Sequence, residues 1–331
     1  MSWETALDRQ IHDYLPDLKW AADEPMAKHT SFRIGGPAKR MAFPKTREQL
    51  VVLMGFLQDA GVKPLLIGNG TNLLVADNGL DTVVIDTSAE LSHIELTDEG
   101  EIAADAGVSL AKLALFAWKN GLTGLEFAHG IPGTLGGGVV MNAGAYGGEM
   151  KQVLRSAAVL FPEEGIRTLS CEELNLSYRH SLLTEHPEAV VLYAEFELTP
   201  GDPEAIRAAM RELMAKRKAS QPLEWPSAGS TFKRPEGHFA GTLIDQCGLK
   251  GLTVGGAQVS EKHAGFVINQ NGATASEIYG LCMEVKRRVQ EQSGVELELE
   301  GERETLERFT EALPLRAPKL AVIEIVEAEF T

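Results

Sequence analysis

The chain has 331 residues, 44% of them hydrophobic, and its 47 acidic and 31 basic residues give a formal net charge of −16. At roughly 150 residues per domain, this length predicts two or three domains with hydrophobic cores. A surface this acidic repels nucleic acid and anionic lipid, so we expect neither as a partner. An anionic ligand would need a site that concentrates basic groups and backbone N–H donors.

The cysteines and histidines argue against a disulfide framework or a metal site. Cys171, Cys247 and Cys282 are far apart with no C-x-x-C pair, and the histidines lack metal-ligand spacing. The first ten residues lack the apolar core of a secretory signal, and no run approaches the roughly 18 apolar residues of a membrane span. We therefore expect a cytoplasmic protein that binds no metal.

The first predicted helix covers residues 46–60. Thr46 and Gln49 stand in capping-box spacing, and Gly61 follows as a stop signal. Three short buried strands are expected next, at residues 64–67, 73–75 and 83–85.

A second group of elements begins near Ile94, where residues 94–104 predict a hairpin. Ser109 is expected to cap a helix that ends at Gly121, and a further hairpin is expected at about 155–169. A strand at 190–198 alternates strongly. Its expected shared face consists of Val190, Leu192, Ala194, Phe196 and Leu198.

Two longer helices complete the predicted elements. Asp202-Pro203-Glu204 provides a cap, a first-turn proline and an acid for a helix that runs to about Lys218. The other helix begins after Thr274, which forms a capping box with Glu277, and ends at Ser293.

Two glycine-rich segments are candidates for binding a phosphorylated ligand. The loop at 68–72 (GNGTN) could aim backbone N–H groups at a diphosphate, or it could be a plain turn between two strands. The segment 130–147 (GIPGTLGGGVVMNAGAYG) is too rich in glycine to be explained by packing. Glycine makes no side-chain contacts in a core, and ordering it on folding costs more conformational entropy than ordering other residues. This composition favours bare backbone lying against a flat, polyanionic ligand over a flexible linker.

Together with five further blocks, these segments resemble the UDP-N-acetylenolpyruvoylglucosamine reductases (MurB). The blocks are TSFRIGGPA at 30–38, YRHS at 178–181, SAGSTFKRP at 227–235, GGAQVS at 255–260 and HAGFVIN at 263–269. They follow the family's order over roughly residues 28–303, and the short spacing from Asn269 to Thr274 resembles the type without a tyrosine-bearing insertion.

The resemblance implies an α+β chain with a two-subdomain FAD-binding fold of the vanillyl-alcohol-oxidase (PCMH) type and a C-terminal α+β substrate domain. The implied parts are FAD-binding subdomains at 1–95 and 96–218, a substrate-binding domain at 219–303, and a tail at 304–331 of unknown role.

The implied reaction is the NADPH-dependent reduction of UDP-N-acetylglucosamine enolpyruvate to UDP-N-acetylmuramate, in peptidoglycan precursor synthesis, through non-covalently bound FAD. The residues that the resemblance assigns to FAD are Gly68, Asn69, Gly70, Thr71, Asn72, Gly130, Ile131, Pro132, Gly133, Thr134, Gly137, Asn142, Gly144 and Ala145.

Hydride addition to the enolpyruvyl group builds negative charge that must be stabilised and then protonated. The resemblance assigns these roles to Arg179, Ser230 and Glu300. An arginine can bind a carboxylate with two parallel hydrogen bonds. The alternative for Arg179 is an ordinary surface arginine that follows a turn. A serine in SAGS is ordinarily a cap or turn residue. Glu302 is the alternative to Glu300, because four acids crowd this stretch.

Basic and polar residues near these blocks are the expected substrate contacts. They are Tyr178, Lys233, Arg234, Lys262, His263 and Asn269. Many family members have asparagine where Arg234 stands, which leaves that contact open. His263 could contact phosphate or cap the turn before Phe266.

Two other functions remain open. One is a different FAD-dependent oxidase of the same superfamily, for which His129 would be the candidate covalent tether. The other is a non-catalytic flavin-binding regulator, which the irregular stretch around Glu300 would suit.

Overall fold

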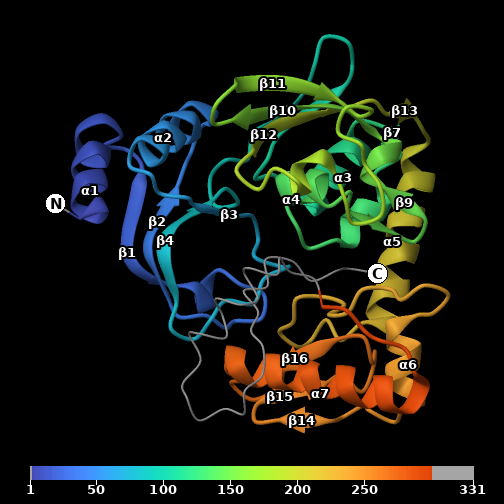
Figure 1. Cartoon of the computed structure of the whole chain (residues 1–331). Helices are drawn as coiled ribbons and strands as arrows, with labels where there is room; N and C mark the ends of the chain where they lie inside the picture. The colour runs from blue at the N-terminus through green and yellow to red at the C-terminus, as the bar shows by residue number, and fades with distance from the viewer. Residues whose placement is uncertain (1, 300–331) are drawn as a thin grey trace. The chain divides into compact units, whose positions relative to one another are not determined.

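The computed structural model describes residues 2–299, which fold into two compact units. The first unit contains the chain up to Glu24, Ala38–Asn69 and Asp81–Ala215. The second contains Pro25–Pro37, Gly70–Leu80 and the chain from Lys216 onward. Figure 1 shows the order of the elements along the chain. The three-part division expected from the sequence stays a prediction.

A four-stranded sheet lies in the N-terminal part, with the strand order β1-β2-β4-β3. The strands are β1 (Lys19–Pro25), β2 (Pro37–Phe43), β3 (Leu65–Ile67) and β4 (Leu80–Asp86). The two helices of this part are α1 (Trp3–Tyr14) and α2 (Arg47–Asp59). The Gln49 backbone N–H donates to the Thr46 hydroxyl at 3.2 Å, which confirms the predicted cap of α2.

The predicted strand at 73–75 is wrong. Leu73, Leu74 and Val75 are buried, but they belong to none of the described strands. A three-residue apolar run signals burial, and burial alone does not require a partner strand.

The second sheet of the first unit is antiparallel throughout, with the order β11-β10-β12-β6-β5. Its strands are β5 (Ile94–Leu96), β6 (Ile102–Asp105), β10 (Leu154–Phe161), β11 (Gly165–Ser170) and β12 (Val190–Phe196). Both predicted hairpins are therefore confirmed. Helix α3 (Leu110–Lys119) begins after Ser109, whose hydroxyl accepts a hydrogen bond from the Lys112 N–H.

Strand β12 contains a β-bulge that the alternation pattern did not reveal. Val191 pairs with Val159 and Tyr193 with Ala158, so Leu192 is an extra residue. One extra residue exchanges the two faces of the strand beyond it. The predicted common face is accordingly wrong: Ala194 and Phe196 share a core with Val191, whereas Val190 and Leu192 pack into a different cluster.

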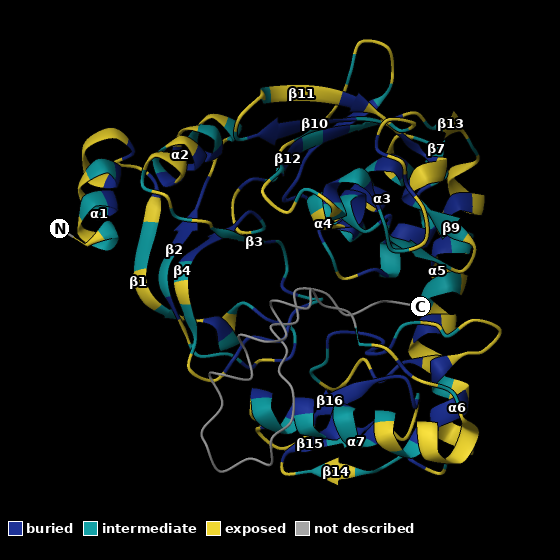
Figure 2. Cartoon of the chain, viewed as in Figure 1, coloured by how far each residue is buried: buried dark blue, intermediate teal, exposed yellow. Residues whose placement is uncertain are grey.

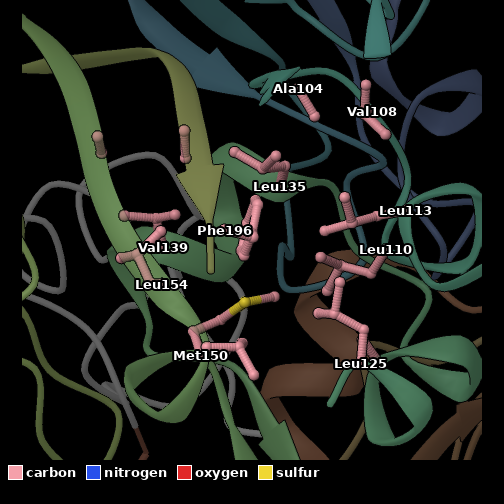
Figure 3. Packing of buried hydrophobic residues seen from close by; sticks show 14 of the residues in the cluster. Ala104, Val108, Leu110, Leu113, Leu125, Leu135, Val139, Met150, Leu154 and Phe196 are labelled. Carbon is pink, nitrogen blue, oxygen red and sulfur yellow. The ribbon is translucent and has the colours of Figure 1, made fainter. Parts of the chain in front are cut away.

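The larger core of the first unit packs the antiparallel sheet against α3 and α4 (Leu135–Val140). Figure 3 shows Phe196 of β12 in this core, together with Leu135 and Val139 of α4. Both α4 residues are fully buried. Helix α4 begins inside the glycine-rich segment, so this core holds part of that segment in place.

Short elements and one long helix complete the first unit. The short elements are β7 (Leu122–Thr123), β8 (Gly144–Ala145), β9 (Gly148–Glu149), β13 (Thr199–Pro200), η2 (Glu126–Gly130), η3 (Met150–Gln152) and η4 (Leu182–Thr184). Helix α5 (Pro203–Ser220) confirms the helix expected from Asp202 onward, and the Glu204 N–H donates to the Asp202 carboxylate at 3.1 Å. Along the chain, the boundary between the units falls inside α5.

The second unit combines a small antiparallel sheet with helices. Its elements are η1 (Met26–Lys28), α6 (Ala240–Gln246), β14 (Thr253–Val254), β15 (Ala257–Val259), β16 (Val267–Asn269) and α7 (Ala275–Ser293). The predicted capping box of Thr274 and Glu277 is present, and Gly294 ends α7 in a left-handed conformation. The buried face of α7 packs on a core around Ile278, and Figure 2 shows exposed residues mainly toward the C-terminal end of this helix. No helix in residues 2–299 is long and apolar enough to cross a membrane.

Candidate functional site

Folding of the first unit brings the two glycine-rich segments into contact. The Asn69 side-chain amide donates a hydrogen bond to the Pro132 carbonyl at 2.5 Å. A Cβ atom on Gly68 would lie 2.1 Å from the Thr134 hydroxyl, so only glycine allows this approach. Residues 63 positions apart in the chain thus lie side by side.

The backbone of the second segment is fixed by the strand and helix before it. The Leu110 N–H donates to the Gly133 carbonyl at 3.0 Å. The Leu135 N–H donates to the Val108 carbonyl and the Gly136 N–H to the Ala106 carbonyl, each at 2.8 Å. The segment is therefore ordered backbone rather than a flexible linker.

Several positions of these segments have room or unused polar groups for a ligand. A Cβ atom on the exposed Gly137 would meet only the Thr134 hydroxyl, at 3.9 Å, so packing within the described protein does not require glycine there. Gly70, in the part of the 68–72 loop that belongs to the second unit, is instead required by the fold, because its φ is +59° and a Cβ atom would lie 1.9 Å from the His29 carbonyl oxygen. The Asn72 Oδ1 is buried without a described hydrogen-bond partner in residues 2–299. The open backbone at Gly137 and the unsatisfied oxygen of Asn72 each leave polar groups for a ligand, and the contact of either residue with FAD stays a prediction.

Asn142 joins the glycine-rich segment to a neighbouring turn. Its Nδ2 donates to the Ser177 carbonyl and to the Glu149 carboxylate, each at 3.0 Å. Its Oδ1 accepts from the Lys151 N–H at 2.9 Å. The residue is buried with a φ of +44°, a conformation that asparagine tolerates better than most residues. The side chain of Asn142 therefore has a structural role inside the protein. Its contact with FAD stays a prediction.

Arg179 lies in the turn that Asn142 supports. Ser177 and His180 exchange backbone hydrogen bonds of 3.0 and 3.2 Å, which leaves Tyr178 and Arg179 at the tip. The φ of Arg179 is +51°, and its guanidinium lies 5.5 Å from the centre of the exposed Tyr178 ring. Strained backbone at a charged residue is typical of functional positions.

Other residues assigned to FAD form local structure. Gly144 and Ala145 make up β8, where a Cβ atom on Gly144 would lie 2.7 Å from the Gly148 carbonyl oxygen. Gly130 ends η2, and Ile131 is buried in the core beside it. Their contact with FAD stays a prediction.

The second unit contains a pocket of about 570 Å³ that is lined by Ser230. Ser230 is only 3% exposed and forms a β-bridge with Phe266. Four of the predicted residues line this pocket, and two of them, Arg234 and Lys262, are cations. Lys250 adds a third cation. The charged and polar lining of the pocket includes Ser230, Arg234, Asp245, Lys250, Lys262 and His263. A protein with a net charge of −16 therefore has a locally basic cavity, as an anionic substrate requires.

The cations of the pocket are oriented by neighbouring groups. The Lys262 Nζ donates to the Lys218 carbonyl at 2.6 Å and lies 3.8 Å from Glu224. The Lys250 Nζ donates to the Asp245 carboxylate at 2.7 Å. The Arg234 guanidinium lies over the Phe239 ring, 4.2 Å from its centre. These contacts direct the flexible side chains without burying them.

His263 is held in one orientation beside Ser230. Its Nδ1 accepts a hydrogen bond from the Gly265 N–H at 3.1 Å, and its ring meets Phe266 edge-on. A Cβ atom on Gly265 would lie 3.2 Å from both His263 Nδ1 and the Ser230 hydroxyl, so the two side chains flank the same glycine. Burial is the largest effect on the pKa of His263 and lowers it, and the charge of Lys250 adds to this lowering. A hydrogen bond to the residue's own backbone acts in the opposite direction but is outweighed.

Three predicted residues lie elsewhere or outside the description. Lys233 does not line the pocket, and its backbone N–H donates to the Glu298 carbonyl. The Asn269 amide donates to the Phe32 carbonyl and accepts from the Ala273 N–H, so it already has a structural role. Glu300 lies outside the described residues, as does its alternative, Glu302. Their roles in catalysis or substrate binding stay predictions.

Lys250 and Phe239 line the pocket but were not predicted from the sequence. Phe239 directly precedes α6 and Lys250 follows it, and neither lies in one of the sequence blocks that carried the resemblance. The basic residue in LKG, just after the helix, is the only signal that could have drawn attention to Lys250. In residues 2–299 no group of three His, Cys, Asp or Glu side chains is arranged to hold a metal ion.

Comparison with known proteins agrees with this arrangement. Residues 38–170 match the model of an FAD binding domain, and residues 221–303 match that of the UDP-N-acetylenolpyruvoylglucosamine reductase C-terminal domain. The chain is 48% identical to the UDP-N-acetylenolpyruvoylglucosamine reductase of Agathobacter rectalis over 303 residues, which is 88% of this chain and 96% of that protein. It is 47% identical to the reductase of Caldanaerobacter subterraneus subsp. tengcongensis, covering 87% and 94% of the two chains.

Among solved structures, the chain resembles the UDP-N-acetylenolpyruvylglucosamine reductase (MurB) from Thermus caldophilus. The TM-score is 0.72 and the identity 36%, with 86% of this chain and 98% of the other covered. These matches confirm the expected α+β FAD-binding fold. The chain belongs to the UDP-N-acetylenolpyruvoylglucosamine reductase family.

Proposed function

We propose that this protein is the FAD-dependent enzyme that reduces UDP-N-acetylglucosamine enolpyruvate to UDP-N-acetylmuramate with NADPH, in peptidoglycan precursor synthesis. Relatives that carry the reductase name over nearly their whole length support this function. The structural observation that carries it is the basic pocket around Ser230, which lies in the segment that matches the reductase C-terminal domain.

FAD is the cofactor, and its proposed site is the pair of glycine-rich segments. Bound FAD supplies hydride transfer from NADPH to the enolpyruvyl double bond. The contact between Asn69 and Pro132 holds the two segments together, and Gly137 offers exposed backbone at which a Cβ atom would meet only the Thr134 hydroxyl among the described residues. Backbone N–H groups in such loops suit a diphosphate.

Arg179 is the proposed electrostatic stabiliser of the charge that develops on the substrate. Its guanidinium stays charged at any physiological pH and can bind a carboxylate through two parallel hydrogen bonds. The turn fixes its backbone, since Ser177 and His180 are bonded to each other across it. A donor held in place before the reaction begins needs no reorganisation as charge develops.

Ser230 is the proposed proton donor. Its hydroxyl oxygen lies in a buried position that lines the pocket, where the proton on Oγ can pass to a carbon that has become electron-rich. The surrounding cations, Lys250, Lys262 and Arg234, stabilise negative charge in the same cavity. Glu300 is the proposed third member of this group.

The UDP-sugar is the proposed occupant of the basic pocket. Arg234, Lys262 and His263 line it and are the proposed contacts for anionic oxygens. Tyr178, Lys233 and Asn269 do not line the pocket, and their proposed contact with the substrate rests on the resemblance to the family. NADPH and nucleotide sugars are metabolites of the cytoplasm, which is where we place the reaction. The net charge of −16 argues against nucleic acid as a partner.

The test is NADPH oxidation by the purified yellow protein, with and without UDP-N-acetylglucosamine enolpyruvate. We expect the substrate to accelerate NADPH oxidation and to yield UDP-N-acetylmuramate in equal amount. Consumption of O₂ in place of substrate, or flavin that remains covalently attached after denaturation, would instead support an oxidase.

A further inference from the structure

We infer that His263 is a neutral hydrogen-bond donor that positions an anionic oxygen of the substrate beside Ser230, through the N–H on its Nε2. This inference rests on the proposed function and assigns a specific atom to substrate recognition. It adds a ligand contact at Nε2 to the local cap that Nδ1 already forms with the Gly265 N–H.

The hydrogen bond at Nδ1 selects one form of the ring. The Gly265 N–H donates to Nδ1, so Nδ1 must carry a lone pair rather than a proton. In a neutral imidazole the proton then resides on Nε2. No residue in the described part of the chain accepts a hydrogen bond from Nε2, and the ring lines the pocket, so this N–H is available to a ligand.

The surroundings of the ring oppose its protonation. A proton on Nδ1 would face the Gly265 N–H, so the local geometry opposes it. Burial, with a smaller contribution from Lys250, lowers the pKa of the ring and outweighs the hydrogen bond to the residue's own backbone, which raises it. The charged groups that line the pocket around it are Arg234, Asp245, Lys250 and Lys262. Asp245 is the only acid among them, and it is bonded to Lys250. His263 therefore remains an uncharged donor near neutral pH.

The packing of the ring fixes the direction of its N–H. A Cβ atom on Gly241 would lie 3.2 Å from His263 Cε1, and one on Gly265 would lie 3.1 Å from the same atom. The imidazole therefore lies between two stretches of bare backbone, with Phe266 against its edge. A donor with a fixed direction adds selectivity that flexible lysine and arginine side chains cannot supply.

Two substitutions separate the ligand contact from the local cap. The amide nitrogen of glutamine can take the place of Nε2–H, whereas the amide oxygen of asparagine can take the place of Nδ1. We expect the flavin-loaded His263→Gln protein to bind UDP-N-acetylmuramate within about 3-fold of the native protein. His263→Asn should bind it roughly 10- to 100-fold more weakly, because it keeps only the bond to the Gly265 N–H.

A second ligand identifies the oxygen that His263 recognises. UDP-N-acetylglucosamine has the diphosphate of UDP-N-acetylmuramate but lacks its carboxylate. A loss in His263→Asn with both ligands would assign the contact to the diphosphate, and a loss with UDP-N-acetylmuramate alone would assign it to the carboxylate. Isothermal titration calorimetry of the native protein and the two variants measures the dissociation constant of each ligand.

The opposite pattern, with His263→Asn binding normally and His263→Gln weakly, would show that the histidine serves only as a cap and would overturn the inference. Equal binding by both variants would overturn it as well. A native flavin-loaded protein that binds neither UDP-sugar would overturn the proposed function itself. Imidazole ¹⁵N NMR of the native protein is a separate check: we expect a proton on Nε2 and none on Nδ1 at pH 7.5, and the reverse would contradict the inference.

Discussion

The side-chain amide of Asn142 donates a hydrogen bond to the Ser177 carbonyl, with 3.0 Å between nitrogen and oxygen. This bond connects the glycine-rich segment proposed to bind FAD with the turn that carries Arg179. Asn142 is buried and makes two further hydrogen bonds, so its amide is fully engaged in holding these parts together.

Asn142→Ala should destabilise the protein by about 2–4 kcal/mol, since three hydrogen bonds of about 1 kcal/mol each are lost at a buried site. Asn142→Gly is the matched control for the backbone, because glycine accepts the φ of +44° without strain. We expect Asn142→Gly to be the less destabilised of the two in urea denaturation. A native-like free energy of unfolding in Asn142→Ala would contradict this account.

Arg179→Lys should lower turnover of the enolpyruvyl substrate about 10²–10³-fold, although the charge is kept, because the planar pair of donors is lost. Flavin reduction by NADPH should change little. The matched control is Arg207→Lys, since Arg207 lies 5.4 Å from the Trp118 ring much as Arg179 lies 5.5 Å from Tyr178. Steady-state kinetics compare them, and near-normal turnover in Arg179→Lys would exclude the proposed role.

Ser230→Ala should separate the two half-reactions. Reduction of the flavin by NADPH needs no proton from Ser230 and should keep close to its normal rate. Reoxidation by the enolpyruvyl substrate should fall roughly 10²–10⁴-fold, the usual contribution of general acid catalysis. Stopped-flow flavin absorbance measures both steps, with Ser156→Ala as the control, because Ser156 is half-buried and bonded to Glu195. Equal slowing of both steps would indicate a structural role for Ser230.

Glu284 should contribute a small, pH-dependent stabilisation of α7. Hydrogen bonds from Arg287 and Arg288 lower its pKa from 4.5 to about 2. Its contribution is therefore fully present above about pH 4.5 and is lost as the pH falls toward about 2. Because both arginine side chains are partly exposed to solvent, which screens the ion pairs, we expect Glu284→Gln to cost only about 0.5–1 kcal/mol at pH 7. Urea denaturation at pH 7 and pH 3.5 should show a smaller difference at the lower pH; a constant difference would contradict the linkage.

Cys282 should resist alkylation in the folded protein. Its thiol is completely buried in the core of the second unit, and burial raises its pKa to about 12. Iodoacetamide at pH 8 reacts with the thiolate, which is nearly absent at this position. Cys247, which is partly exposed, is the internal control. Mass spectrometry should find Cys282 modified only after denaturation, and early labelling would show that the core around α7 opens readily.

The sequence predicted the local features of the fold well. The caps at Thr46, Ser109 and Thr274 all form, because a capping side chain bonds backbone only three residues away. The blocks around Gly68, Gly130 and Ser230 likewise sufficed to indicate the family, since their residue order can be read directly from the chain.

Features that depend on a partner distant in the chain were decided only by the tertiary structure. The bulge at Leu192 exists because β12 pairs with β10, and no pattern within β12 marks the extra residue. Only the folded structure places Lys250 in the same pocket as Ser230. Likewise, only folding brings the Asn142 amide to the Ser177 carbonyl that it binds. The sequence by itself determined the caps, the turns and the types of chemical group present. Long-range packing decided which of those groups share a pocket, because it sets distances between residues that chain order leaves free.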